Sequence, residues 1–573
     1  MAKTEATVEE LVSMIERGKL RLPEMQRRYV WRSTRVRDLL DSLYRGYPSG
    51  AILVWETDEG VPLQDMAVAQ ESGHIGSSQL LLDGQQRLTS LSAVIRGIPV
   101  EVRGRKRPIE LLFNLEHPEK LAFVTEVDED GEDEESEDDE EEGIDEENAD
   151  SSDDELQKRF NKMTFVVSTR KLEQLPCWVK VTDVFQSDSD TPFLKRAGIS
   201  GFDDPRYEKY SHRLARLRSI KRYSYRIDVL ERTLDYDEVT EIFVRVNSLG
   251  AKLRSSDLAL AQITAKWRNS LAEFQSYQKQ CAGQGFDLDL GIHLKNLVAF
   301  ATGQSRFLTV GRLSLETLQT AWEQSREGMD FALNFLRSNA GIDSPALLSS
   351  PFLLVTLAFF GHRRNYHLAP QEEERLKYWC LLANAKGRYS RGSSETILDQ
   401  DLAILRTGGA EDLIDRLRQQ VGRLDIAADE LEGRNQRSAL FKTMFLAFRA
   451  AGAKDWKSQL SIALSHSGSQ HRLQFHHIFP KAVLKGIYST READDIANLA
   501  FIGGKTNRAI SDKPPALYFP KTLEKSGMDA FITQCIPTDE ALLVPESYKA
   551  FLNERRKRIA DCLNRYLGVT PTG

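Results

Sequence analysis

The sequence predicts a multidomain α+β protein with a largely helical middle region. At 573 residues, the chain is longer than a single hydrophobic core usually sustains. Short apolar strand segments alternate with helical patterns up to about residue 257, and residues 258–451 show mainly the three- and four-residue apolar spacing of helices. A second strand-and-helix region follows. We therefore expect three domains, at residues 1–257, 258–451 and 452–573.

In the first domain, we expect an amphipathic helix from about Thr34 to Tyr44 and strands at Ala51–Trp55 and Gln79–Leu82. The second strand leads into the turn Asp83-Gly84, and a helical pattern begins directly afterwards. Backbone N–H groups at a helix start bind anions, and Arg87 adds a guanidinium suited to phosphate oxygens. This turn is therefore a candidate phosphate site.

A strongly acidic segment interrupts this domain. Residues 126–155 contain 21 Asp or Glu and no Lys or Arg, so the formal charge of −8 for the chain becomes +13 for the remainder. Such a run cannot bury apolar surface, and we expect a disordered insertion at about 126–157. It is either a solubilising linker or a mimic of DNA that covers a basic groove.

The basic remainder offers candidate contacts to phosphate at Arg206–Arg226 and in a loop at Lys386–Ser394. Between the two ends of the chain, helices are expected where apolar residues recur at helical spacing. These helices should bridge the N-terminal and C-terminal regions. The segments are Leu258–Tyr277, Leu313–Ala340, Glu372–Ala385, Ala410–Leu431 and Arg437–Ala451.

The C-terminal domain carries the most informative motif. It consists of Gln474-Phe-His-His-Ile-Phe-Pro-Lys481, then Asn498-Leu499, then Lys505-Thr-Asn-Arg508. A nuclease that uses one metal ion needs a base, a divalent cation and a group that orients the base. Two adjacent histidines on a strand point to opposite faces and could serve two of these tasks.

We assign His477 as the general base and His476 as a metal ligand. Asn507, near the start of a probable helix, is the expected second ligand, and this donor set suits Mg²⁺ or Mn²⁺. Asn498 is expected to orient the base through its other ring nitrogen. The alternative is that the histidines belong to the core and the asparagines form turns.

The ordered residues His-His-Ile-x-Pro, Asn-Leu and Lys-x-x-Asn-Arg resemble the HNH nucleases, which have a ββα-metal fold. The segment Ser511–Pro514 also fits that pattern. This sequence lacks the Cys-x-x-Cys zinc knuckles of many HNH domains, because its five cysteines are scattered.

The first 260 residues resemble the N-terminal domain of GmrSD-type restriction endonucleases. The resemblance rests on Leu22–Trp31, Arg45–Gly50, Leu81–Leu91 and Ile242–Asp257. It implies a ParB/sulfiredoxin-like fold, joined as here to a C-terminal HNH domain. It also implies binding and hydrolysis of GTP or ATP by the residues Asp83, Gly84, Gln85, Gln86 and Arg87, with Asn247 closing the pocket and with Gln26 and Arg27 facing either the nucleotide or a DNA backbone.

The resemblance implies a nucleotide-regulated, metal-dependent DNA endonuclease of type IV-like restriction, which cleaves modified DNA in anti-phage defence. Two alternatives stay open: a phosphorothioate-linked or unspecific DNA-nicking effector, and a ParB-like nucleotide-dependent DNA-binding switch with an inactive HNH fold. We expect a cytoplasmic protein without a membrane partner, because the cysteines are unpaired and no apolar run reaches membrane-spanning length. Whether the chain forms a homo-oligomer stays open.

Overall fold

The computed structural model describes residues 2–26, 29, 31, 33–57, 61–64, 66–68, 70, 78–97, 109–118, 160, 162–169, 171–249 and 254–570, with residues 78 and 247–249 described by their backbone only. The expected acidic insertion and Arg27 lie outside these ranges. The chain divides into two compact units, residues 1–271 (unit 1) and 272–573 (unit 2).

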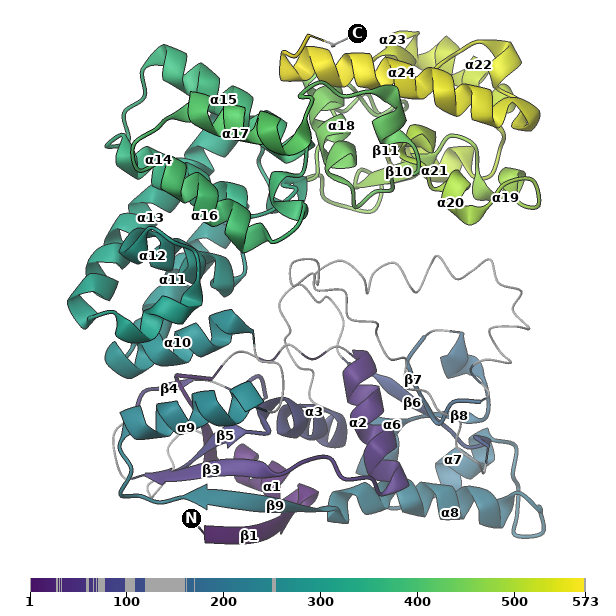
Figure 1. Ribbon diagram of the computed structural model, residues 1–573. Coiled ribbons are helices and arrows are strands. Elements are labelled where there is room, and N and C mark those ends of the chain that lie inside the picture. The colour runs from purple at the N-terminus through teal and green to yellow at the C-terminus, as the bar shows by residue number, and fades with distance from the viewer. Residues whose placement is uncertain are drawn as a thin grey trace. The chain divides into compact units, whose positions relative to one another are not determined.

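A six-stranded mixed sheet forms the centre of unit 1 (Figure 1). The strand order is β1-β9-β3-β5-β2-β4. Neighbouring strands are parallel at β9/β3 and β5/β2 and antiparallel at the other three pairs. The strands are β1 (Ala2–Thr7), β2 (Leu20–Pro23), β3 (Ile52–Thr57), β4 (Leu63–Gln64), β5 (Ser78–Asp83) and β9 (Ser224–Leu230).

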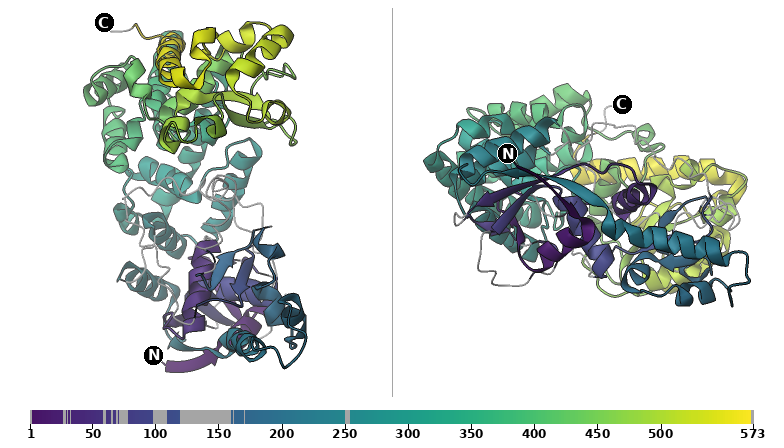
Figure 2. Two further views of the ribbon diagram at one scale, coloured as in Figure 1. Left: turned by 90° about the vertical axis from the view of Figure 1, so that its right-hand side faces the viewer. Right: turned by 90° about the horizontal axis from the view of Figure 1, so that it is seen from below.

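Both faces of this sheet are covered by helices, because its inner strands are apolar on both sides. On β3, Ile52 and Val54 face a core shared with α1 and α3, whereas Leu53 and Trp55 face a core shared with α9 and α10. Figure 2 gives further views of these layers. The helices are α1 (Val8–Glu16), α2 (Ser33–Arg45), α3 (Gln85–Arg96), α9 (Tyr236–Leu249) and α10 (Ser255–Lys266).

Unit 1 also contains a three-stranded antiparallel sheet in the order β7-β6-β8. Its strands are β6 (Leu111–Asn114), β7 (Phe165–Val167) and β8 (Trp178–Lys180). Around it lie α6 (Val181–Gln186), α7 (Thr191–Arg196), α8 (Tyr207–Arg218) and the 3-10 turns η2 (Leu172–Gln174) and η3 (Ser219–Arg222). The α+β class predicted for the N-terminal region is confirmed.

Several cations of the Arg206–Arg226 stretch are bound to the protein's own backbone. Arg213 donates from Nη1 to the carbonyl of Leu115 at 2.6 Å, and Arg216 donates from Nε to the carbonyl of Tyr44 at 2.9 Å. Arg218 donates from Nε to the carbonyl of Ser187 at 2.9 Å. These side chains hold α8 against its neighbours, which differs from the expected role as phosphate contacts.

One long helix expected at Leu258–Tyr277 is two helices. The chain leaves helical geometry after α10, and Asn269 has a φ of 68°. The buried carboxylate of Glu24 accepts the N–H groups of Asn269 (2.9 Å) and Leu271 (2.7 Å) and so fixes the start of α11. Because Ala261 of α10 also packs in the core of unit 1, unit 1 extends past the expected boundary at residue 257.

Unit 2 is largely helical over its described residues. Its helices are α11 (Ser270–Gly283, which begins in unit 1), α12 (Leu290–Thr302), α13 (Leu315–Ser338), α14 (Phe352–Arg363), α15 (Pro370–Ala385), α16 (Ser394–Ile404), α17 (Ala410–Val421), α18 (Ala439–Ala450), α19 (Lys481–Leu484), α20 (Thr490–Ala493), α21 (Gly504–Ile510), α22 (Pro515–Ser526), α23 (Asp529–Ile532) and α24 (Tyr548–Leu567). The 3-10 turns are η4 (Phe307–Arg312), η5 (Pro345–Leu347), η6 (Arg388–Ser390), η7 (Ala428–Leu431), η8 (Ile496–Asn498), η9 (Glu540–Leu542) and η10 (Pro545–Ser547). Its strands are β10 (Leu473–His477) and β11 (Leu499–Gly503).

The expected middle and C-terminal domains are parts of this one unit. Three phenylalanines of α18, Phe441, Phe445 and Phe448, surround the ring of Phe501 on β11 with ring centroids 5.1, 5.3 and 6.0 Å away. Helix α18 therefore contributes side chains to the hydrophobic core of both the expected middle domain and the expected C-terminal domain. None of the helices within the described ranges combines the length and the apolar character that a bilayer-spanning segment needs.

The loop Lys386–Ser394, expected to offer flexible cations, is anchored by buried ion pairs. Arg388 and Asp401 have side chains only 1% and 0% exposed, and the Nε of Arg388 lies 2.6 Å from the Oδ2 of Asp401. Tyr389 donates its hydroxyl hydrogen to the same carboxylate at 2.7 Å. Lys386 is also buried and donates to Glu430 at 3.0 Å. These cations stabilise the fold.

We predict that Asp401→Ala strongly destabilises unit 2, because it leaves the Arg388 guanidinium buried without its counter-ion, at a cost of about 3–5 kcal/mol. Faster hydrogen exchange in the α14 and α16 peptides would measure the loss. The control is Asp415→Ala, which removes an ion pair to Arg418 whose side chains are 55% and 52% exposed; it should cost less than about 1 kcal/mol. Equal effects of the two substitutions would contradict this account.

Candidate functional site

The C-terminal motif forms an antiparallel strand pair followed at once by a helix. Strand β10 pairs with β11 so that His476 lies opposite Ala500 and His477 opposite Leu499. Helix α21 begins directly after β11 and carries Asn507. His477 is the last residue of its strand, which places it where the chain leaves the sheet.

His476 points into the unit and contacts two polar side chains. It is 3% exposed. Its Nδ1 lies 2.8 Å from the Oδ1 of Asn507, and its Nε2 lies 3.3 Å from the hydroxyl of Tyr518 on α22. Burial lowers the pKa of His476 to about 4. The ring is therefore neutral near pH 7, the form that binds metal ions.

Asn507 is held in place from two directions. Its Nδ2 donates to the Oε1 of Gln474 on β10 at 2.7 Å. The start of α21 is fixed by the buried carboxylate of Asp455, which accepts the N–H of Gly503 at 2.7 Å and the hydroxyl of Thr506 at 2.9 Å. The structure thus brings together the two residues that the sequence predicts as metal ligands.

These residues fit a hard divalent cation. An imidazole nitrogen and an amide oxygen lie 2.8 Å apart, and both kinds of ligand are accepted by Mg²⁺ or Mn²⁺. Across the described ranges, no group of three or more His, Cys, Asp or Glu residues could hold a metal ion. A cation held by the two side chains of His476 and Asn507 would keep several water ligands, as Mg²⁺ commonly does.

His477 contacts a carboxylate that the sequence did not single out. Its Nε2 donates to the Oδ1 of Asp494 at 2.8 Å, which leaves Nδ1 as the ring atom with a lone pair. Lys481 lies 2.9 Å from the same carboxylate oxygen. Burial raises the pKa of Asp494, but the hydrogen bonds from His477 and Lys481 outweigh burial and the pKa is lowered. The carboxylate stays ionised.

Asn498 has a different role from the one predicted. We expected its amide to orient the ring of His477. The side chain is instead fully buried and donates from Nδ2 to the carbonyls of Phe479 (3.0 Å) and Ala493 (2.9 Å). Its Oδ1 accepts the N–H of Phe479 at 2.9 Å. Asn498 therefore joins two backbone segments, and Asp494 is the residue that contacts His477.

Sequence reasoning missed Gln474, Asp494 and Tyr518 as parts of this site. Gln474 could have been found, because it lies two residues before His476 on one strand and hence on the same face. Asp494 and Tyr518 lie 17 and 42 residues from their histidine partners. Neither position follows from a local pattern.

In unit 1, the motif Asp83–Arg87 joins β5 to α3 as predicted. Gly84 has a φ of +100°, and a Cβ atom there would lie 2.4 Å from the Cδ1 of Ile52. The guanidinium of Arg87 donates to the carbonyls of Ser49 and Ala51, the latter at 2.7 Å, and to the Oδ2 of Asp83 at 3.0 Å. The guanidinium expected for phosphate is thus bound to the segment before β3.

The other predicted nucleotide residues are mostly buried. Gln26, Gln85 and Gln86 are 5%, 5% and 9% exposed, and Gln26 donates to the carbonyl of Leu81 at 3.1 Å. The side chain of Asp83 is 40% exposed. Asn247 lies on α9, but its side chain and all of Arg27 fall outside the described residues. The structure brings Asp83, Gln26 and Arg87 to the end of β5.

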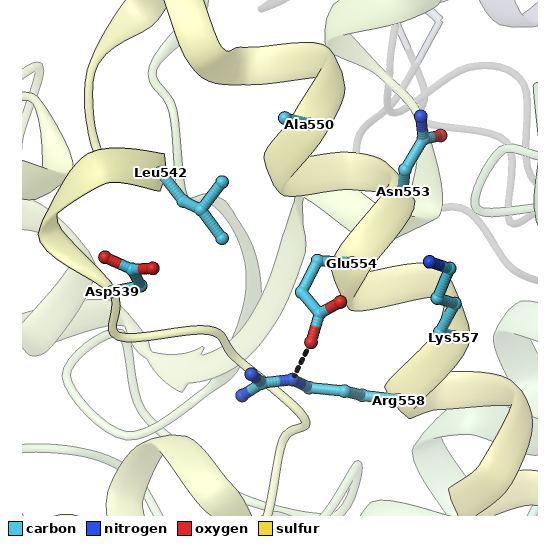
Figure 3. Close-up of a pocket in the computed structure, with 7 residues that line it drawn as sticks. All are labelled: Asp539, Leu542, Ala550, Asn553, Glu554, Lys557 and Arg558. Atoms are coloured by element: carbon cyan, nitrogen blue, oxygen red, sulfur yellow. Dashed lines mark hydrogen bonds and ion pairs between the residues drawn. The ribbon is translucent and has the colours of Figure 1, made fainter.

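A hollow on α24 is separate from these motifs (Figure 3). Among its lining residues, the Nε of Arg558 lies 2.9 Å from the Oε1 of Glu554. None of the predicted site residues lines it. The lining residues are Asp539, Leu542, Ala550, Asn553, Glu554, Lys557 and Arg558.

Two comparisons with known proteins cover different lengths of the chain. An uncharacterized protein of Methanocaldococcus jannaschii is 23% identical over 556 residues, which covers 90% of this chain and 86% of that protein. Residues 8–264 match the family model described as GmrSD restriction endonuclease, N-terminal domain. That match ends before unit 2. Residues 8–264 are therefore similar to the N-terminal domain of GmrSD restriction endonucleases.

Proposed function

We propose that this chain is a metal-dependent DNA endonuclease of type IV-like restriction, with its cutting site at His476, His477 and Asn507. The observation that carries the proposal is the convergence of His476 and Asn507 at 2.8 Å beside a histidine held by a carboxylate. The match of residues 8–264 to a restriction endonuclease domain supports DNA as the substrate. In this proposal, β10, β11 and α21 form a ββα-metal motif, and unit 1 has a ParB/sulfiredoxin-like fold.

His477 acts as the general base. Because Nε2–H donates to Asp494, the lone pair of Nδ1 is the one that accepts a proton from the attacking water. The ionised carboxylate then stabilises the imidazolium that forms. His476 and Asn507 would hold a divalent cation, which would supply positive charge to polarise the scissile phosphate and stabilise the leaving oxygen.

Exposed cations near Asn507 supply contacts to the DNA backbone. Lys505 and Arg508 lie on α21 with Asn507 and are exposed. Lys513 is also exposed and follows shortly after the end of this helix. Lysine and arginine contacts to phosphate give affinity that depends on salt and not on base sequence. Selection of modified DNA therefore falls to other parts of the chain, and we assign it to unit 1.

Unit 1 is further proposed to bind GTP or ATP at the end of β5 and to regulate cleavage. One support is the turn at Gly84, whose positive φ lets the chain pass directly from β5 into α3. The other is the partly exposed carboxylate of Asp83 beside this turn. The carbonyl contacts of Arg87 assign this side chain to positioning the turn.

We predict that His477→Ala lowers DNA cleavage by about 10²- to 10⁴-fold, the usual contribution of a general base. The assay supplies Mg²⁺ with GTP or ATP and compares unmodified, glucosyl-hydroxymethylated and phosphorothioated DNA. His471→Ala is the matched control, because His471 is exposed and lies outside the site. Cleavage confined to one modified substrate and lost only in His477→Ala is the expected result.

Other outcomes of this assay would redirect the proposal. Equal cutting of all three DNAs would favour a general nicking effector. Binding of DNA without cutting by the wild-type protein would favour a nucleotide-dependent binding switch. Cleavage by the His477→Ala variant at the wild-type rate would indicate that the catalytic base lies elsewhere in the chain.

We predict that Asp494→Asn lowers the cleavage rate by at least about tenfold, because the amide can present N–H to His477 and hold the ring in the wrong tautomer. Single-turnover cleavage at saturating Mg²⁺ measures the effect. Asp512→Asn makes the same chemical change on the exposed loop after α21 and should leave the rate unchanged. A wild-type rate in Asp494→Asn would mean that Asp494 does not orient the base.

We predict that Arg87→Ala lowers the melting temperature of unit 1 whether or not a nucleotide is present, because two backbone carbonyls and Asp83 lose their donor. Asp83→Asn should instead weaken GTP or ATP binding in calorimetric titrations and change the melting temperature little. If wild-type protein binds neither nucleotide, the regulatory part of the proposal fails and the nuclease part stands.

A further inference from the structure

We propose that Gln474 and Tyr518 are positioning residues that aim the Nδ1 of His476 and the Oδ1 of Asn507 at one divalent cation. This inference rests on the proposed function. It concerns residues that hold the two ligands in their binding orientation and do not touch the cation themselves. Hydrogen-bond partners of metal ligands often act in this way.

Tyr518 decides which ring nitrogen of His476 carries the hydrogen. Its hydroxyl donates to the backbone carbonyl of Ile478 at 3.0 Å, so its oxygen is the atom left to accept a hydrogen bond. The Nε2 of His476, 3.3 Å away, is the donor that this oxygen faces. A neutral imidazole has a single N–H. With that hydrogen on Nε2, the lone pair of Nδ1 is directed at Asn507.

Gln474 decides which end of the Asn507 amide faces the histidine. Its Oε1 accepts the Nδ2–H of Asn507 at 2.7 Å, which turns the Oδ1 of Asn507 toward His476. Gln474 can do this because residues two apart on a strand lie on one face, the face that α21 covers. An amide nitrogen turned toward His476 would place a hydrogen where a cation binds.

Together these contacts place two acceptor atoms opposite each other. The Nδ1 of His476 and the Oδ1 of Asn507 are 2.8 Å apart, and both are acceptors if the ring hydrogen is on Nε2. Two facing lone pairs repel each other. A divalent cation bound by both removes the repulsion, so the hydrogen-bond network favours the loaded site. The competing arrangement has the ring hydrogen on Nδ1, where it donates to the Oδ1 of Asn507, and the lone pair on Nε2.

The test is a titration of the full-length protein with Mn²⁺ alone, followed by electron paramagnetic resonance of the free ion. We expect Gln474→Met and Tyr518→Phe each to weaken Mn²⁺ binding by about tenfold or more, the usual effect of losing such a partner. Gln474→Glu keeps the acceptor oxygen and should bind at least as tightly as wild type. Raising the Mn²⁺ concentration should restore cleavage to Gln474→Met.

Matched controls make the same changes outside the site. Gln470→Met alters an exposed glutamine, and Tyr488→Phe removes a hydroxyl that likewise donates to a backbone carbonyl, that of Pro545 at 3.1 Å. Both should bind Mn²⁺ as wild type does. Thermal melts of all variants separate a loss of metal affinity from a loss of fold.

Two results would overturn the inference. If folded Gln474→Met and Tyr518→Phe bind Mn²⁺ as tightly as wild type, neither residue positions a ligand. If Gln474→Glu loses affinity, the acceptor oxygen is not the active group. Failure of the proposed function looks different: wild type and His476→Ala would then bind Mn²⁺ equally, or wild type would bind none.

Discussion

The side-chain amide of Asn498 is the contact on which the geometry of the C-terminal site depends. It is fully buried and makes three hydrogen bonds, two of them to the backbone of Phe479. Phe479 follows β10 by two residues, and Asn498 immediately precedes β11. The amide therefore fixes where β10 ends and where β11 begins, and so the position of His477. Because a buried N–H without an acceptor costs about 1–3 kcal/mol, only a side chain that both donates and accepts can fill this position.

The C-terminal helix α24 also binds the backbone on both sides of Asn498. Arg555 is fully buried and donates to the carbonyls of Ala497 and Leu499, both at 2.8 Å, on either side of Asn498. Arg556 pairs with the buried Asp495 at 2.6 Å. Burial lowers the pKa of Arg555 to about 10, so it remains charged near neutral pH. A side chain more than 50 residues after Asn498 thus fixes the backbone on which the motif depends.

The periodicity of apolar residues predicted helices correctly where local sequence determines them. It failed where contacts with residues far along the chain determine where a helix ends. The expected helix at Thr34–Tyr44 is α2, Ser33–Arg45, because its apolar stripe faces the core. The expected helix at Leu258–Tyr277 is broken, because Glu24 accepts N–H groups about 245 residues away. The residues of the C-terminal site divide in the same way into those predicted from local sequence and those that are not. The pairing of His476 with Asn507 followed from motif order, whereas Asp494 and Tyr518 required the folded chain.

The two predicted motifs differ in the hydrogen-bond partners that their polar side chains already have within the protein. At Asp83–Arg87, the guanidinium already has acceptors in Ser49, Ala51 and Asp83, so a nucleotide would have to compete with the protein's own carbonyls. At His476 and Asn507, the Nδ1 and the Oδ1 lie 2.8 Å apart, and these are the two atoms that we propose as ligands of a divalent cation. Sequence shows both motifs as equally polar. The hydrogen-bond partners of each group distinguish side chains that stabilise the fold from candidate ligands, and by that criterion the proposed metal site has more support than the proposed nucleotide site.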